Sequence, residues 1–108
     1  RTSAKLWREM SEYLSRDSET SQWLSGLLTS TTRSFIRDGI ADDHALVRNK
    51  AGWISEAGCN ATCDAGLIDV DGDIYIMSIM TSMPWSDRSS ELVTVIAKTF
   101  FDTRAALA

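Results

Sequence analysis

The chain has 108 residues, of which 44% are hydrophobic and 24% are charged. This composition fits one small globular domain, or part of a larger one, and excludes a disordered chain. The sequence has 11 basic and 15 acidic residues, a formal net charge of -4, so no basic surplus remains for general nucleic-acid binding. No apolar run approaches the roughly 20 residues that a membrane-spanning helix needs.

The first part of the chain has the spacing of short helices. Apolar side chains recur every three or four residues within 2–14, 22–28 and 33–38, which predicts three helices. Trp23 falls on the expected inner side of the second helix. Gly39 would end the third helix, because glycine adopts the left-handed cap conformation without strain.

After the third helix the spacing of apolar side chains changes from helical to alternating, which predicts strands. We expect strands over residues 44–54, 67–70 and 74–81. Asp71-Gly72 predicts a two-residue hairpin turn between the second and third strands, since both turn positions need a positive φ. The segment 74–81 is apolar on both faces and therefore needs cover on both sides.

A long amphipathic helix is predicted at the end of the chain. Pro84 separates it from the third strand, and we expect it over residues 90–107. The predicted fold class is therefore α+β, with three N-terminal helices, a three-stranded antiparallel sheet and a long C-terminal helix. Residues 1–39 would form the helical part, and residues 44–108 the sheet with the last helix.

One short motif carries a chemical signal. Lys50-Ala51-Gly52-Trp53 is expected at the end of the first strand, and Asp64-Ala65-Gly66 follows after a stretch rich in turn residues. A lysine, a small residue and a glycine on a strand edge match the K-[TS]-G pattern of penicillin-recognising serine hydrolases. Together with the order of elements around it, this motif makes the whole chain resemble the C-terminal part of a class A β-lactamase-like serine hydrolase.

The resemblance implies roles for four consecutive residues. Lys50, Ala51 and Gly52 would bind substrate: Lys50 gives a positive charge for a carboxylate, and Gly52 lets the substrate approach the backbone closely. The backbone N–H of Trp53 would be one donor of an oxyanion hole. The three-residue match taken alone also fits a solvated lysine at a strand end. We expect no metal and no cofactor.

Two departures from the family pattern stand out. Position 51 is alanine, where the family usually carries threonine or serine, so the hydroxyl that would bind a substrate carboxylate is absent. The sequence also contains no S-x-x-K and no S-D-N; Ser86-Asp87-Arg88 is the nearest string to the latter. The chain begins with Arg1 and not with methionine, and we expect its N-terminus to have been cut by processing or cloning. The nucleophile would then lie upstream, and this chain alone would be inactive.

The function expected for the parent protein is that of a β-lactamase-like serine hydrolase that acts on β-lactams or related peptides through an acyl-enzyme. The alternative is a non-catalytic binding or interaction module of the same fold. A third interpretation is an unrelated α+β domain in which the K-A-G string is accidental. The expected partner is the N-terminal half of the same protein, or a second copy paired through the edge of strand 74–81, and neither nucleic acid nor a membrane. The expected location is the periplasm or cell surface of a bacterium.

Two cysteines and one histidine could carry other chemistry. Cys59 and Cys63 lie four residues apart in a predicted turn region, where a disulfide and two free thiols are both open. A zinc site would need a second pair of ligands, which the sequence lacks. His44 is the single histidine, and we expect it at the surface.

Overall fold

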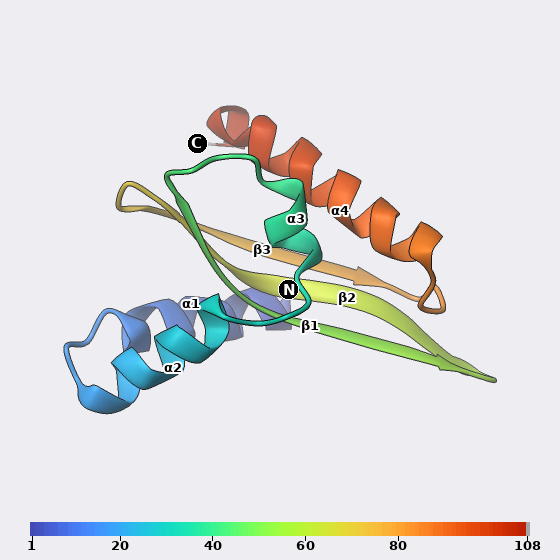
Figure 1. Cartoon of the computed structure of the whole chain (residues 1–108), viewed down its shortest axis with the longest axis horizontal. Helices are drawn as coiled ribbons and strands as arrows, with labels where there is room; N and C mark the ends of the chain where they lie inside the picture. Colours follow the sequence, from blue (N-terminus) through green and yellow to red (C-terminus); the bar gives the residue numbers. More distant parts are fainter. Residues whose placement is uncertain (108) are drawn as a thin grey trace.

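Helices enclose a three-stranded antiparallel sheet in the computed structural model, which describes residues 1–107 (Figure 1). The predicted α+β fold class is confirmed over this range. In chain order the elements are α1 (Thr2–Leu14), α2 (Glu19–Thr29), α3 (Phe35–Gly39), β1 (Ala45–Glu56), β2 (Cys59–Val70), β3 (Asp73–Thr81), α4 (Asp87–Asp102) and a short 3-10 helix (Arg104–Leu107).

The sheet has the strand order β1-β2-β3, and two tight turns set its register. Asp71 and Gly72 have φ values of 53° and 95°, so the predicted hairpin turn between β2 and β3 is confirmed. A second two-residue turn, Ala57-Gly58, joins β1 to β2, with Gly58 at φ 79°. The twelve residues of β1 pair one to one with the twelve of β2, from Ala45 opposite Val70 to Glu56 opposite Cys59.

The first hairpin is longer than the sequence pattern predicted. The segment between residues 55 and 66, expected to be rich in turns, instead continues both strands around the Ala57-Gly58 turn. Small and polar residues there lack the alternation of apolar side chains that signals a strand. The main-chain hydrogen bonds of an antiparallel ladder form without such alternation. The end of this hairpin therefore projects beyond the helices, with Gly52 to Asn60 all exposed (Figure 1).

The two faces of the sheet are covered by different helices. On one face α3 and α4 pack on Val47, Ile68 and Ile79 in a core that continues through Phe35, Ile36, Val93, Ala97 and Phe101. On the opposite face Trp7 of α1 packs against Ala65 and Leu67 of β2. The central strand β2 is thus covered on both sides, which accounts for its unbroken buried run from Asp64 to Ile68.

Serine side chains fix the start of two helices. Ser18 begins α2 and Ser86 begins α4, each as the first half of a capping box with the serine three residues later. The last helix therefore begins at Asp87, not at residue 90 as predicted, and its regular part ends at Asp102. The expectation for Trp23 is wrong, because its side chain is 64% exposed on α2.

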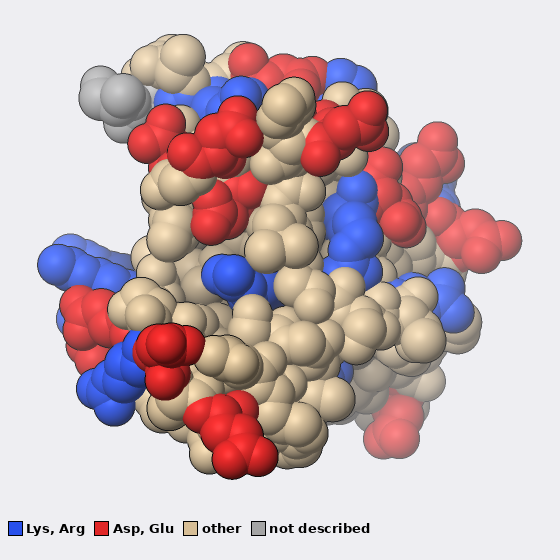
Figure 2. All heavy atoms as spheres, turned by 60° about the vertical axis from the view of Figure 1, so that its left-hand side comes forward, with Lys and Arg blue, Asp and Glu red and all other residues tan. Residues whose placement is uncertain are grey.

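Charges are mixed over the surface. On the face drawn in Figure 2, acidic and basic side chains are interspersed around a broad uncharged area, and neither sign forms a continuous stripe. His44 is exposed, as expected, and lies 3.3 Å from the carboxylate of Asp71. None of the described helices is long and apolar enough to cross a membrane.

Candidate functional site

Lys50, Ala51, Gly52 and Trp53 lie together in β1, an edge strand of the described sheet. The expectation that they end the strand is wrong, because β1 continues to Glu56. The physical reason is the long ladder of the first hairpin, which carries the strand past the motif. The motif instead marks the point where β1 leaves the core: Ala51 is 4% exposed, and every residue after it in β1 is exposed.

The backbone of the motif is directed alternately toward β2 and toward the free edge. The residues flanking a tight two-residue turn exchange hydrogen bonds, and bonded and non-bonded pairs then alternate along an antiparallel ladder. Counting from Glu56 opposite Cys59, the odd-numbered residues of β1 direct their N–H and C=O groups away from β2. Val47 shows this directly, since its carbonyl oxygen accepts a hydrogen bond of 3.1 Å from the Arg37 guanidinium. The N–H of Trp53 therefore points to the free edge.

A cavity of about 220 Å³ opens beside this edge. Two cationic side chains, Lys50 and Arg33, line it, and no acidic side chain does. The Lys50 ammonium donates to the carbonyl oxygen of Ala51 at 2.5 Å. The remaining residues that line the cavity are Thr31, Thr32, Ala51 and Trp53. In a protein of net charge -4, a cavity lined by two cations favours an anionic ligand.

Gly52 leaves the backbone of the motif open. An added Cβ at this position would meet no atom within 4 Å. A ligand can therefore approach the strand closely there, as the glycine of the motif implies.

An arginine and two tryptophans form a stack at the same edge. The indole rings of Trp53 and Trp85 have centroids 5.7 Å apart. The Arg33 guanidinium lies 5.6 Å from the Trp53 ring and 5.4 Å from the Trp85 ring, within the range of cation–π attraction. We call this group the Arg33–Trp53–Trp85 stack. The sequence pattern did not single out Arg33 or Trp85. Arg33 was expected at the start of the helix over 33–38 but lies in the loop before α3, and Trp85 lies in the loop before α4.

A buried network of polar groups lies next to the motif. The Asp64 carboxylate accepts a hydrogen bond of 2.8 Å from Asn49 and one of 3.0 Å from the Ile36 N–H. The Asn49 carbonyl oxygen accepts from the Thr31 hydroxyl at 2.7 Å and from the Arg37 guanidinium at 3.1 Å. The network therefore ties the strand residue before Lys50 to the loop that forms the other wall of the cavity.

Asp64 lies fully buried in this network. Burial disfavours the charged form and raises the pKa of its carboxyl above the ordinary value. The hydrogen bonds from Ile36 and Asn49 act in the opposite direction without cancelling the effect of burial on this pKa. Asp64 belongs to the Asp64-Ala65-Gly66 string singled out in the sequence, and its side chain supports the site without lining the cavity.

The two cysteines lie on one strand and not across a loop. Cys59 and Cys63 both belong to β2 and are free. Four residues of extended strand separate them by about 13 Å, whereas a disulfide needs Cα atoms within about 7 Å. A disulfide between them is therefore excluded in this structure. No group of three or more histidine, cysteine or acidic side chains that could hold a metal comes together within residues 1–107.

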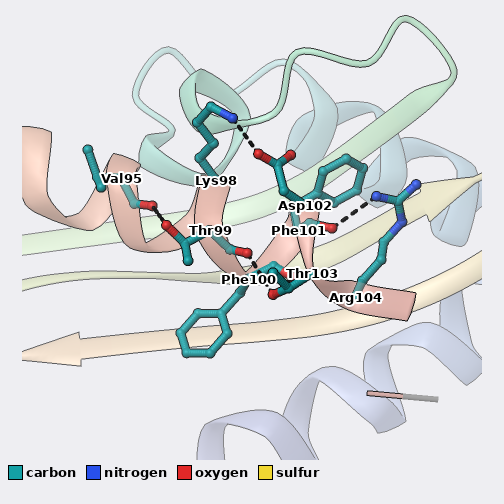
Figure 3. Close-up of polar contacts among 8 residues, drawn as sticks. All are labelled: Val95, Lys98, Thr99, Phe100, Phe101, Asp102, Thr103 and Arg104. Atoms are coloured by element: carbon teal, nitrogen blue, oxygen red, sulfur yellow. Dashed lines mark hydrogen bonds and ion pairs between the residues drawn. The ribbon is translucent and has the colours of Figure 1, made fainter. Parts of the chain in front are cut away.

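A larger cavity of about 480 Å³ lies at the opposite edge of the sheet, along β3. It is lined by Tyr75 and Met77 of β3, by Phe100 and Phe101 near the end of α4, and by Arg104 of the short 3-10 helix. Arg104 donates to the Phe101 carbonyl oxygen at 2.9 Å, and Phe100 extends from α4 toward the sheet (Figure 3). This cavity holds none of the motif residues, so it is separate from the site on β1.

A family model and a solved structure both match this chain. The sequence model described as "Beta-lactamase enzyme family" matches residues 1–103. Among solved structures, the chain is similar to a beta-lactamase from Chitinophaga pinensis DSM 2588, with a TM-score of 0.73 and 21% identity. The match covers 95% of this chain and 40% of that one, so the chain spans less than half the length of the structure it resembles. No curated protein sequence shows significant similarity.

Proposed function

Because the chain belongs to the beta-lactamase enzyme family, we propose that it is the C-terminal part of a serine hydrolase that acts on β-lactams or related peptides through an acyl-enzyme. The observation that carries the proposal is the free edge of β1. Lys50 and an outward N–H of Trp53 lie there beside a cavity lined by cations. Substrates of this class present a carboxylate and a reactive acyl carbonyl, which are the two groups such an edge can hold.

The proposed chemistry divides between this chain and the part upstream of it. A serine from the upstream part attacks the substrate carbonyl, and the carbonyl oxygen takes up the electron pair of the double bond. The double bond then re-forms as the C–N bond breaks, the nitrogen takes up the proton that the serine has lost, and an acyl-enzyme remains. The Trp53 N–H stabilises the negative oxygen that develops during the attack. The Lys50 ammonium attracts the substrate carboxylate and so holds the carbonyl near the serine.

Ala51 supports an alternative function. Ala51 is one of the residues lining the cavity, but it offers no hydroxyl to a substrate carboxylate. A family member that had lost catalysis and kept binding would tolerate this change. The alternative is therefore a non-catalytic module that binds an anionic peptide or β-lactam at the same cavity.

The open edge of β3 supports a proposal about the partner. Within the described sheet β3 pairs only with β2, so its other edge is free. The side chains of Ile74, Ile76 and Met80 on this strand are exposed. Such edges recruit another strand. We assign this edge to the N-terminal half of the same protein, or to a second copy in its absence.

A protein that acts on peptidoglycan-type peptides also needs export to the periplasm or cell surface.

Acylation of the full-length protein by a fluorescent penicillin tests the proposed function. We expect a covalently labelled band, and we expect labelling to be slower in Lys50→Ala. A hydrogen bond to a charged group contributes about 1.5–3 kcal/mol, so the rate should fall roughly tenfold to a hundredfold. The matched control is Lys5→Ala, an exposed lysine on α1, which should label like the wild type. Reversible binding without a labelled band would favour the non-catalytic alternative, and no binding would contradict both.

A further inference from the structure

Trp53 lies where β1 loses the support of the hydrophobic core. Ala51, two residues earlier, is the last buried residue of the strand. The Trp53 side chain is 41% exposed, and its aromatic and cationic contacts come from Trp85 and Arg33. The ladder with β2 sets the direction of the Trp53 backbone, and the side-chain contacts that add to this ladder come from two loops far apart in the sequence.

The loop that carries Trp85 is anchored on both sides. Ser86, the next residue, caps α4 through hydrogen bonds with Ser89. The Thr62 hydroxyl bonds the Met83 carbonyl oxygen at 3.0 Å and the Ser89 hydroxyl at 3.2 Å. Thr62 is buried and is the register partner of Trp53 on β2. The Trp85 ring is thus fixed relative to the strand pair that contains Trp53.

The loop that carries Arg33 is anchored to β1 itself. The Asn49 amide points to the Arg33 carbonyl oxygen at 3.5 Å, and Thr31 bonds the Asn49 carbonyl oxygen at 2.7 Å. Ser34, the next residue, caps α3. Neither of the ion pairs found within residues 1–107 includes Arg33, so its guanidinium is free to lie against the two indole rings.

We propose that Arg33 and Trp85 are positioning residues that hold Trp53, so that its backbone N–H keeps the outward direction needed at the free edge. The oxyanion role of this N–H rests on the proposed function. Charge on the substrate oxygen develops only as the carbonyl is attacked, so a donor held in place accelerates acylation and leaves substrate binding unchanged.

Acylation kinetics of the full-length protein with benzylpenicillin test the positioning role. We expect Trp85→Ala to lower the acylation rate constant by roughly three- to tenfold, the scale of a lost aromatic contact, with the dissociation constant unchanged. Arg33→Ala should lower the rate constant by a similar factor and also raise the dissociation constant, because Arg33 is one of the two cations that line the cavity. Trp85→Phe and Arg33→Lys should restore most of the rate. The matched control is Trp23→Ala, an exposed tryptophan on α2. A change in the dissociation constant alone, or an equal loss in the Trp23 variant, would overturn the inference.

Far-ultraviolet circular dichroism tests the stack without any activity. Two indole rings in contact give an exciton couplet, which should disappear in Trp85→Phe, weaken in Arg33→Ala and persist in Trp23→Phe. Acylation of the wild type without a couplet would overturn the positioning role of Arg33 and Trp85 but not the proposed function. A couplet without acylation would overturn only the proposed function, because Arg33 and Trp85 would still hold Trp53.

Discussion

The side chains of Asn49 on β1 and Asp64 on β2 form a buried hydrogen bond of 2.8 Å one residue before Lys50. Asp64 also accepts the N–H of Ile36. One carboxylate therefore joins the motif strand, the central strand and the start of α3. Neither Asn49 nor Asp64 exposes any surface, so the position of the motif depends on groups that no substrate touches.

Replacing Asp64 with asparagine should destabilise the protein in a manner that depends on pH. An amide at this position places its N–H₂ group against the donors of Asn49 or Ile36, which leaves a buried donor unpaired at a cost of about 1–3 kcal/mol. Burial raises the pKa of Asp64 in the folded state above its unfolded value of 3.8, so the folded protein binds the proton more tightly.

The contribution of this pKa shift to stability is therefore fully present below pH 3.8 and is lost as pH rises through the raised pKa. The free energy of unfolding of the wild type should exceed that of Asp64→Asn by the largest amount at acid pH. This difference between the two free energies should become smaller as pH rises. Urea unfolding of both proteins at matched pH values measures this difference. A difference that widened as pH increased would contradict the assignment.

Two glycine substitutions should have opposite effects on stability. A Cβ at Gly66 would lie 2.2 Å from the Arg48 carbonyl oxygen and 2.8 Å from the Asn49 Cα, so Gly66→Ala should force the strands apart and cost about 1–3 kcal/mol. Gly26 lies within α2, and an added Cβ there meets nothing within 4 Å. Gly26→Ala should therefore stabilise the protein by about 0.5–1 kcal/mol. Thermal unfolding of the two variants gives both values, and equal effects would contradict the close approach at Gly66.

The 108-residue chain alone should not hydrolyse β-lactams. The sequence contains no S-x-x-K, so it has no serine activated by a neighbouring lysine in the manner of the family. Turnover of a chromogenic cephalosporin, followed by absorbance, should equal that of buffer. Hydrolysis above this level would mean that a residue of this chain supplies the nucleophile.

Restoring a hydroxyl at position 51 should improve a parent enzyme that binds carboxylate-bearing β-lactams. A hydrogen bond to a charged group contributes about 1.5–3 kcal/mol, so Ala51→Thr in the full-length protein should raise the acylation efficiency roughly tenfold or more. The second-order rate constant for benzylpenicillin measures the effect, and Ala51→Val controls for side-chain size. An unchanged or lower rate in the threonine variant would mean that the natural substrate does not use this position.

The isolated chain should self-associate through the edge of β3. Ile76 is 39% exposed on this strand, and a lysine on an edge strand opposes pairing with another chain. Light scattering after size-exclusion chromatography should show oligomers for the isolated wild-type chain and a shift toward monomer for Ile76→Lys. Leu46→Lys, an equally exposed position on β1, should leave the oligomers in place. A cooperative wild-type monomer would refute the open edge as an association site.

The sequence pattern predicted the elements whose apolar spacing is regular and missed those held by other forces. The spacing over 2–14 and 74–81 located α1 and β3 closely. The first hairpin was underestimated because residues 55–66 are held by main-chain bonds, which leave no periodic signal. In the site, K-A-G identified Lys50 through a known pattern, whereas the stacking partner Trp85 became visible only when the fold brought its loop to β1.

The most direct test of the proposed function is the intact mass of the full-length protein after incubation with benzylpenicillin. The proposal predicts an increase equal to one penicillin molecule, mapped by peptide analysis to a serine upstream of Arg1. It also predicts slower formation of this adduct in Lys50→Ala than in Lys5→Ala. No mass increase, or an adduct that forms at the same rate in both variants, would contradict the claim that this strand edge belongs to an acyl-transfer site.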